Sequence, residues 1–422
     1  MASGLPCTFQ PEVDVSEGSG GEGAFARLVP QIIGTKVGDL LPSCPDYHRA
    51  TPPDPPSGVP IAIALSGGGF RATLSSLGVL RFLADAGLLE QVRYVSSVSG
   101  GSIANALFAG GYEALERSGF ATDRFDDVVL LPTLGRIAQT SMSDAIIRDL
   151  WRALGPATRT TILADTLDDW FFGGMKLHAL PPPCRYIFNA ANLSTGVRFG
   201  FERETIGDYV LGTVSSAPVD LRVADAVAAS AAVPGVFPAY TPKARFPCGN
   251  GLRPKLVDGG AYENTGMEPI DNLDGAFLVV LNAGGIFRPG PFGGLPIVRD
   301  LQRSESLLYR QSTALRMRNM VSRFKAWEAA RKEDRDPPTY GRRGVLFALE
   351  STVDAAADWV GLNPAVSDAE RLRLAGLKTS FARFSAADAR QLVYQGWWLT
   401  GACISTYHRD LIDGDLPVWR PL

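Results

Sequence analysis

The sequence predicts an α/β fold in which helices cover a mainly parallel central sheet. The apolar run "IAIAL" at 61–65 and the β-branched run "VRYVSSV" at 92–98 have the character of strands, and each continues through a glycine turn into a helical pattern. The later runs at 254–260 and 275–285 also end in glycine turns. Strands that alternate with helices in this way are typical of α/β units with a parallel sheet.

The bulk composition is that of a globular protein. The chain has 422 residues, of which 45% are hydrophobic and 20% are charged, and its formal net charge is −3. This charge gives no reason to expect a nucleic-acid partner. No segment has the pattern of a secretory signal or of a transmembrane helix, so we expect a cytoplasmic protein that would meet membranes only from the aqueous side.

The cysteines favour a reducing compartment as well. They are far apart, they form no C-x-x-C pair, and their number, five, is odd. A disulfide framework usually shows an even number of cysteines in a short secreted chain. The sequence therefore favours free thiols over a disulfide framework at Cys7, Cys44, Cys184, Cys248 and Cys403.

The chain divides by composition into three parts. Residues 1–60 predict a disordered tail and a proline-rich lead-in, because the start is rich in Gly, Ser and Glu and the end reads "ATPPDPPSGVP". Residues 61–290 predict the α/β core. Helical patterns and aromatic residues at 120–180 interrupt this core, so that insertion is a candidate cap over a functional site. Residues 291–422 predict a helical extension packed on the core.

One stretch of the extension, 303–335, predicts a basic amphipathic helix with nine Lys or Arg and four Asp or Glu. Such a helix can lie on an anionic membrane surface. Packing of its apolar side on the core, with the basic face in solvent, is the favoured interpretation. That apolar side consists of Leu307, Leu308, Leu315, Met320, Val321 and Phe324.

The first glycine turn, in "LSGGGFRA" at 65–72, predicts a seat for an anion. Glycines let a bound group approach the backbone, and the N-terminus of the next helix offers unpaired N–H groups. The N–H groups of Gly67, Gly68 and Gly69 could receive the oxyanion of a tetrahedral intermediate. Arg71 could fix the loop or add positive charge.

A dinucleotide-binding turn is the main alternative for this segment, because "GGGFRA" fits G-x-G-x-x-A after a strand. That fingerprint also needs an acidic residue at the end of the next strand to bind the ribose. The next strand ends in "SSVSGG" and has no acid there. The dinucleotide interpretation is therefore disfavoured.

The second glycine turn, "SVSGG" at 97–101, fits the G-x-S-x-G nucleophile elbow with Ser97 in the place of the first glycine. Ser99 would lie at the apex, and Gly100 and Gly101 would leave room for substrate and for the turn. Such a pentapeptide also occurs in ordinary loops. Its placement favours a nucleophile, because it ends a predicted strand and opens a helix on the sheet edge where the first turn also lies.

A serine nucleophile needs a base, and an acid is the better candidate. His48, His178 and His408 do not lie at strand-end glycine turns, so we expect none of them to act in chemistry. Asp258 ends the apolar run of "LVDGG" and is followed by Gly259 and Gly260, which support the turn. A carboxylate there could accept the proton of Ser99. The alternative is an ordinary Asp-Gly turn.

With these residues identified, the chain resembles the patatin-like phospholipase family. The likeness covers roughly residues 61–285 and includes "FNAANLSTGVRFGF" at 188–201. Four blocks occur in the family's order: "SGGGFRA" at 66–72, "SVSGG" at 97–101, "AASAAVPGVFPAY" at 228–240 and "VDGG" at 257–260. The resemblance implies a three-layer α/β/α sandwich and a Ser–Asp dyad without histidine, and we expect neither metal nor cofactor.

Carried over by residue, the resemblance makes Ser99 the nucleophile and Asp258 the base, with Gly67 to Gly69 and Arg71 on the oxyanion side. Two residues depart from the pattern. Ser66 stands where patatins often have an acid, which is more similar to the cytosolic phospholipase A2 type. Ser97 stands where glycine is usual in the elbow.

The resemblance implies a phospholipase A-type activity on carboxylic esters of membrane phospholipids, with lipid as the partner and peripheral membrane contact. Lysophospholipids, triacylglycerols and thioesters remain alternative substrates. A non-catalytic module that binds lipid or a protein partner is a further alternative. The head-group preference, the oligomeric state and any regulator are not predicted by the sequence.

Overall fold

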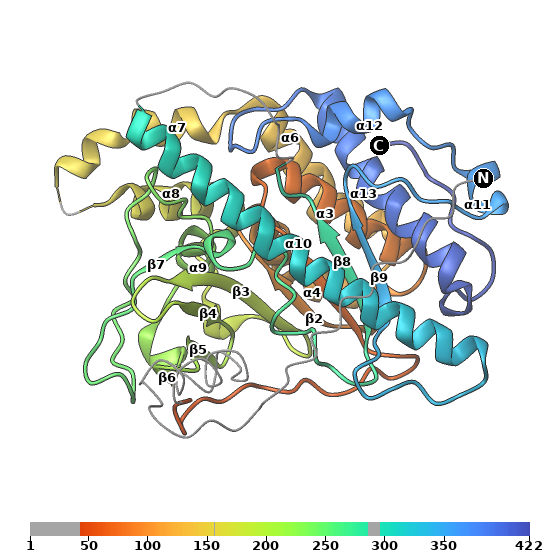
Figure 1. Ribbon diagram of the computed structural model, residues 1–422. Helices are drawn as coiled ribbons and strands as arrows, with labels where there is room; N and C mark the ends of the chain where they lie inside the picture. Colours follow the sequence, from red (N-terminus) through yellow and green to blue (C-terminus); the bar gives the residue numbers. More distant parts are fainter. Residues whose placement is uncertain (1–42, 156, 286–295) are drawn as a thin grey trace, which may run out of the picture. The chain divides into compact units, whose positions relative to one another are not determined.

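The computed structural model describes residues 43–155, 157–285 and 296–422, so the predicted disordered tail lies outside the described residues. Its centre is a nine-stranded sheet of order β6-β5-β4-β3-β2-β1-β8-β9, with β7 paired to β3 (Figure 1). The strands are β1 (Ile61–Leu65), β2 (Val92–Ser97), β3 (Arg185–Asn192), β4 (Val197–Phe201), β5 (Thr205–Asp208), β6 (Gly212–Ser215), β7 (Leu256–Asp258), β8 (Phe277–Asn282) and β9 (Arg343–Ala348).

The sheet confirms the predicted α/β class, and it is parallel in one half. Strands β9, β8, β1, β2 and β3 run parallel to one another. Strands β4, β5, β6 and β7 pair in antiparallel fashion, which makes "mainly parallel" an overstatement. The reason is loop length: only residues 193–196 separate β3 from β4, and so short a link can return the chain only as an antiparallel neighbour.

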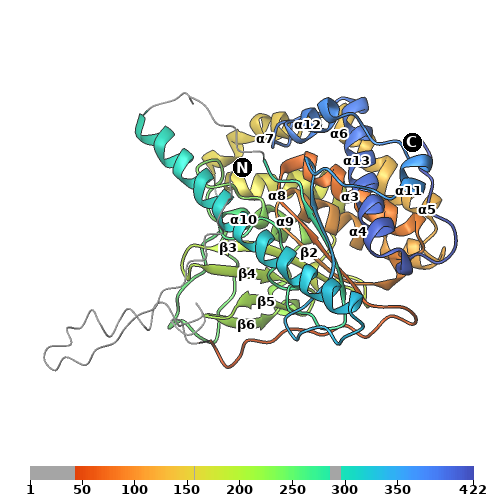
Figure 2. The ribbon, with the colours of Figure 1, turned by 45° about the vertical axis from the view of Figure 1, so that its right-hand side comes forward.

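Helices cover both faces of the parallel half (Figure 2). One face packs on α3 (Gly69–Asp85), α4 (Gly100–Glu116), α9 (Val223–Ser230) and α13 (Ala386–Tyr407). The other face packs on α10 (Pro296–Lys332). Strand β1 has apolar side chains on both faces of the sheet, so both faces must be buried by helices. Ile61, Ile63 and Leu65 belong to one apolar core, and Ala62 and Ala64 belong to the other.

The insertion at 120–180 is helical, as predicted. It consists of α5 (Thr122–Phe125), η2 (Asp126–Leu130), α6 (Leu131–Gln139), α7 (Met142–Arg148), η3 (Leu150–Leu154), α8 (Arg159–Leu167), η4 (Asp168–Phe172) and η5 (Leu177–Ala179). Within it, α8 packs on α9 and α6 packs on α13. The remaining elements are η1 (Leu89–Gln91), η6 (Ala217–Val219), η7 (Gly259–Ala261), α11 (Ala357–Leu362), α12 (Asp368–Ala375) and η8 (Arg409–Leu411).

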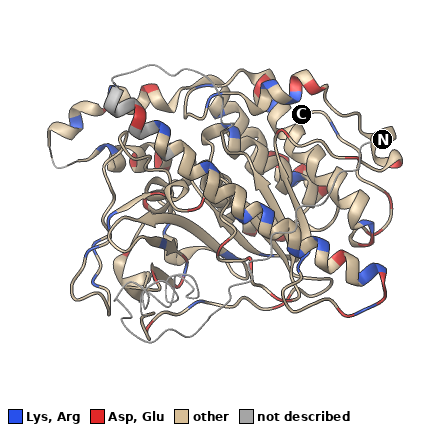
Figure 3. Ribbon diagram, in the orientation of Figure 1, with Lys and Arg blue, Asp and Glu red and all other residues tan. Residues whose placement is uncertain are grey.

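Helix α10 packs on the sheet with part of its predicted apolar side only. Met320 is 2% exposed and belongs to the core under the helix, whereas Leu307 and Leu308 are 54% and 67% exposed. Lys and Arg residues recur along the described part of the helix (Figure 3). Among the described residues, no helix combines the length and the apolar character needed to cross a bilayer.

A disulfide joins Cys44 to Cys248, which corrects the expectation of free thiols at these two positions. The lead-in runs along the β5–β6 hairpin, where Cys44 N–H donates to Tyr209 O and Cys248 N–H donates to Leu211 O. The two cysteines are 204 residues apart in sequence, so their spacing gave no sign of the pairing. Cys184 and Cys403 are free and buried. Because disulfides are typical of oxidising compartments, the cytoplasmic location stays a prediction.

Candidate active site

Ser99 lies at the apex of the turn between β2 and α4. Its backbone angles are φ 49° and ψ −118°, a left-handed conformation that costs a residue with a Cβ on the order of 1–3 kcal/mol. Ser97 remains in the strand, so its side chain meets no such strain. Only 6% of Ser99 is exposed. Strain of this kind at a nearly buried serine is typical of a nucleophile elbow.

Gly100 and Gly101 allow α4 to begin directly against the first glycine turn. A methyl group on the Cα of Gly100 would lie 2.0 Å from Gly69 O, and one on Gly101 would lie 2.4 Å from Leu65 O. These distances are far below van der Waals contact, so only glycine fits. The close backbone approach brings the elbow and the "GGG" turn together at one edge of the sheet.

Ser230, on α9, fixes the elbow from the other side. Its hydroxyl accepts the N–H of Ser99 at 2.9 Å and donates to Asn189 O at 2.6 Å. Ser102 Oγ lies 3.0 Å from the same hydroxyl. In the sequence, the segment 228–240 stood out only by its family likeness, and Ser230 had no predicted role. A lone serine inside an alanine-rich helix was the available signal.

A buried polar chain supports the elbow from beneath. The Asn189 amide donates to Ser97 O at 2.9 Å, and Arg198 donates to Asn189 Oδ1 at 3.0 Å. Glu268 pairs with Arg198 at 3.4 Å and with Arg316 of α10 at 2.8 Å. Burial alone would raise the pKa of Glu268, but the two guanidinium groups lower it below its usual value. The carboxylate therefore stays ionised between two cations.

The "GGG" turn presents two backbone donors rather than the three predicted. Gly67 N–H donates to Asn264 O at 3.0 Å, which corrects the expectation that it would face an oxyanion. Gly68 and Gly69 have φ angles of 150° and 60°, which only glycine adopts readily. Within the described residues, the N–H groups of Gly68 and Gly69 have no hydrogen-bond acceptor. These two groups can therefore receive an anion.

Arg71 is 1% exposed and fixes a loop. Its guanidinium donates to Ala283 O at 2.8 Å, to Ala375 O at 2.9 Å and to Leu377 O at 2.6 Å. It also donates to Thr379 Oγ1 at 3.1 Å. Of the two roles considered for Arg71, these contacts support the positioning of the loop rather than direct contact with an oxyanion.

Asp258 is the last residue of β7 and is 8% exposed. Its Oδ1 accepts the N–H of Gly260 at 2.8 Å. A methyl group on Gly259 would lie 2.5 Å from Asn189 O and 3.0 Å from Val98 Cγ1. The turn after Asp258 therefore packs against the residue that precedes Ser99.

Asn264 lies where the three turns meet. A methyl group on Gly67 would lie 2.3 Å from Asn264 Oδ1 and 3.2 Å from Ser99 Cβ. A methyl group on Gly260 would lie 3.0 Å from Asn264 Oδ1 and equally far from Asp258 Oδ1. The elbow, the "GGG" turn and the Asp258 turn thus surround one amide. Asn264 was not among the predicted site residues, although only three residues separate it from "DGG".

The histidines lie elsewhere. His48 and His178 are exposed, and His408 is buried against the rings of Phe277 and Trp327. Phe277 begins β8, whereas the glycine turns follow the ends of the strands. His408 is therefore at the opposite edge of the sheet from Ser99.

His408 gives a stability prediction. Burial, with help from Arg343, lowers the pKa of His408 to about 4. The unfolded chain binds a proton there below about pH 6.5 and the folded protein does not, so the free energy of unfolding falls as the pH falls from about 6.5 towards 4. Replacement of His408 by Gln should remove up to about 2–3 kcal/mol of this acid sensitivity and change kcat less than about tenfold.

Urea unfolding of both proteins at several pH values between 7 and 4 measures this effect. The stability difference between wild type and His408→Gln should shift in favour of the variant as the pH falls. A difference that stays constant over this range would contradict the prediction, and a large loss of kcat would contradict the exclusion of His408 from the chemistry.

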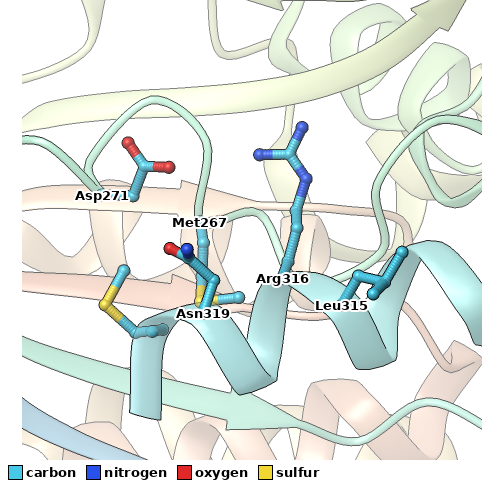
Figure 4. A pocket seen from close by; sticks show the side chains of 6 residues that line it. Met267, Asp271, Leu315, Arg316 and Asn319 are labelled. Carbon is cyan, nitrogen blue, oxygen red and sulfur yellow. The ribbon is translucent and has the colours of Figure 1, made fainter. Parts of the chain in front are cut away.

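Two cavities lie away from these turns. One, of about 290 Å³, is lined by Met267, Asp271, Leu315, Arg316, Asn319 and Met320 (Figure 4), and burial raises the pKa of Asp271. The other, of about 460 Å³, is lined by Tyr112, Glu113, Glu116, Arg117, Pro181, Pro182 and Pro183. Neither cavity contains Ser99 or Asp258.

The chain is similar to solved structures of known proteins, and the likeness to the first of them supports the same fold. Human GIVD cytosolic phospholipase A2 superposes with a TM-score of 0.50 at 16% identity, over 84% of this chain and 60% of that chain. The same enzyme in complex with methyl gamma-linolenyl fluorophosphonate gives 0.49 at 17% identity, with the same coverage of 84% and 60%. VipD from Legionella pneumophila gives 0.32 at 16% identity, over 80% and 67%. The present chain therefore spans about 60% of the length of the human enzyme.

No curated protein matches the sequence at a significant level. The family model of patatin-like phospholipase matches residues 63–271. This range contains the "GGG" turn, the elbow with Ser99, Ser230 and Asp258. The chain therefore contains a patatin-like phospholipase domain, which spans residues 63–271.

Proposed function

We propose that this protein is a serine lipid acyl hydrolase that cleaves carboxylic ester bonds of membrane phospholipids, with Ser99 as nucleophile and Asp258 as base. The observation that supports this most is the strained Ser99 at the meeting point of two other turns. One of these offers the N–H groups of Gly68 and Gly69, and the other carries the carboxylate. The patatin-like phospholipase domain supports the same class of reaction.

The reaction begins when the Asp258 carboxylate accepts the proton of the Ser99 hydroxyl. Ser99 Oγ then attacks the ester carbonyl carbon, and the N–H groups of Gly68 and Gly69 donate to the oxyanion. The C–O bond to the glycerol breaks, and the leaving alkoxide takes the proton from Asp258. Water repeats the sequence on the acyl-serine, with Asp258 as base again. Ser230 keeps the backbone of Ser99 in place throughout.

Aromatic side chains next to the oxyanion turn suit an acyl chain. Phe70 follows Gly69 directly, and its ring centroid lies 5.4 Å from that of Phe381 and 6.4 Å from that of Phe171. Trp170 stacks edge-on against Phe171 at 6.0 Å. Phe171 and Trp170 belong to the 120–180 insertion, so this cluster supports its role as a cap over an apolar substrate.

The same insertion exposes apolar side chains that support peripheral contact with a membrane. Ile147, Trp151 and Leu154 are 64%, 69% and 93% exposed. Tryptophan and leucine at such positions favour the interfacial region of a bilayer.

Product analysis tests this function. Vesicles of phosphatidylcholine and phosphatidylglycerol should yield free fatty acid and lysophospholipid in equal initial amounts, measured by mass spectrometry. Emulsified triacylglycerol should be cleaved at least about tenfold more slowly. Ser99→Ala protein under the same conditions is the control. Release of fatty acid from triacylglycerol alone would point to a lipase, and no release from any lipid or soluble ester would contradict a hydrolase.

A further inference from the structure

Helix α10 lies outside the patatin-like phospholipase domain, yet one of its side chains reaches the candidate catalytic turns. The helix crosses one face of the sheet (Figure 1). Leu308 and Gln311 on it are exposed, whereas Tyr309 between them is half-buried and turned inward.

The ring of Tyr309 covers the turn that follows the candidate base. A methyl group on the Cα of Gly260 would lie 3.4 Å from Tyr309 Cε2 and 3.0 Å from Asp258 Oδ1. Both atoms are thus close to the same point, so the ring edge and the carboxylate are neighbours. Gly260 N–H also donates to that carboxylate at 2.8 Å. Contact with the ring therefore limits both the position of the turn and the access of water to Asp258.

The hydroxyl of Tyr309 lies near Gly284, just after the end of β8. A methyl group on Gly284 would lie 2.5 Å from Tyr309 Oη, 2.9 Å from Asn264 Nδ2 and 2.9 Å from Asn282 Oδ1. Asn282 contacts α10 a second time, because its amide lies 3.3 Å from Met317 Sδ. The phenol is thus placed among polar groups that belong to the turns around Asn264.

The charges around Tyr309 keep its hydroxyl protonated. Burial raises the pKa of Tyr309, and the carboxylates of Asp258, Glu263 and Glu350 raise it further, while Arg71 opposes them. These four groups come from three separate segments of the chain. A phenol in this setting cannot act as a base at neutral pH, but it can shield and position a carboxylate.

We propose that Tyr309 is a positioning residue for the base Asp258: its ring packs beside the Gly260 turn that holds the carboxylate and shields that carboxylate from water. The inference rests on the proposed function. It assigns to α10, a helix beyond the matched domain, a part of the catalytic geometry. The ring is the essential part, because the ring edge lies beside the Gly260 turn and next to the carboxylate.

The test compares Tyr309→Leu, Tyr309→Phe and the exposed-residue control Gln311→Ala on a short soluble p-nitrophenyl ester. A fluorophosphonate titrates the reactive serine in each sample, so that kcat refers only to correctly folded sites. Tyr309→Leu should lower kcat at least about tenfold with a KM change below about threefold. The acidic limb of the pH–rate profile of Tyr309→Leu should also shift to lower pH by about half a unit. The reason is that water would then reach Asp258 and stabilise its ionised carboxylate.

Tyr309→Phe and Gln311→Ala should keep the wild-type pH profile and stay within about threefold of its kcat. A uniform loss of kcat in Tyr309→Leu without a pH shift would mean a merely structural role and would overturn the proposal. A Tyr309→Phe protein as impaired as Tyr309→Leu would overturn it too, since the hydroxyl would then be essential. If wild-type protein neither cleaves the ester nor reacts with the fluorophosphonate, the proposed function itself is wrong.

Discussion

Replacement of Ser99 by alanine is expected to abolish ester hydrolysis while the protein stays folded. The change removes only the hydroxyl, and the hydrogen bond from Ser99 N–H to Ser230 Oγ comes from the backbone and remains possible. Alanine has the same Cβ as serine, so the left-handed conformation at φ 49° costs about the same. Turnover of a p-nitrophenyl acyl ester should fall at least about a thousandfold, or about 4 kcal/mol of barrier.

Ser76 offers a matched control for this experiment. It is a fully buried serine on α3, and its hydroxyl has no hydrogen-bond partner among the described residues. Ser76→Ala should therefore keep both activity and fold. A serine-directed fluorophosphonate should label the wild type at Ser99, as peptide mapping can show. Label on another serine, or normal turnover by folded Ser99→Ala protein, would rule out this nucleophile.

The rule that parallel strands end at one edge of a sheet accounts for two of the three predicted turns. Strand β2 ends just before Ser99, β1 ends just before the "GGG" turn, and β7 ends at Asp258. Each of these ends is visible in the sequence as an apolar run followed by glycine. Local pattern was thus enough to find three turns, and the parallel rule was enough to expect that the first two meet. Strand β7 runs antiparallel to β3, so the rule does not explain why the turn at Asp258 joins them.

The contacts that fix these turns were not predictable, because they depend on residues far apart in the chain. Arg71 donates to Ala375 O across 304 positions, and Ser99 N–H reaches Ser230 across 131. The disulfide of Cys44 depends on how the lead-in folds back on a hairpin. Gly67 illustrates the same limit, since only tertiary structure shows that its N–H is occupied by Asn264 O.

Replacement of Asp258 by asparagine is expected to lower kcat by several orders of magnitude, with little loss of stability. In the wild type, Gly260 N–H donates to Asp258 Oδ1 at 2.8 Å. Asparagine keeps the size of the side chain and has an oxygen that can accept the same hydrogen bond. It loses the capacity to take the proton of Ser99, and no histidine lies in the site to replace it. Because the base must be ionised, the wild-type rate should rise with pH from the acidic side, and the residual rate of the variant should lack that rise.

Asp271→Asn is the matched control. Asp271 is another partly buried carboxyl group and belongs to the segment that follows β7. Its side chain lines the cavity beside α10, away from Ser99 (Figure 4). It should keep kcat and the pH profile of the wild type. Stopped assays between pH 4 and 9, normalised to the folded fraction, separate the two variants. Should Asp258→Asn retain a near-normal kcat, another group must deprotonate Ser99. Should it lose activity only by unfolding, the carboxylate would be a structural turn residue, and the Asp–Gly turn alone would explain "VDGG".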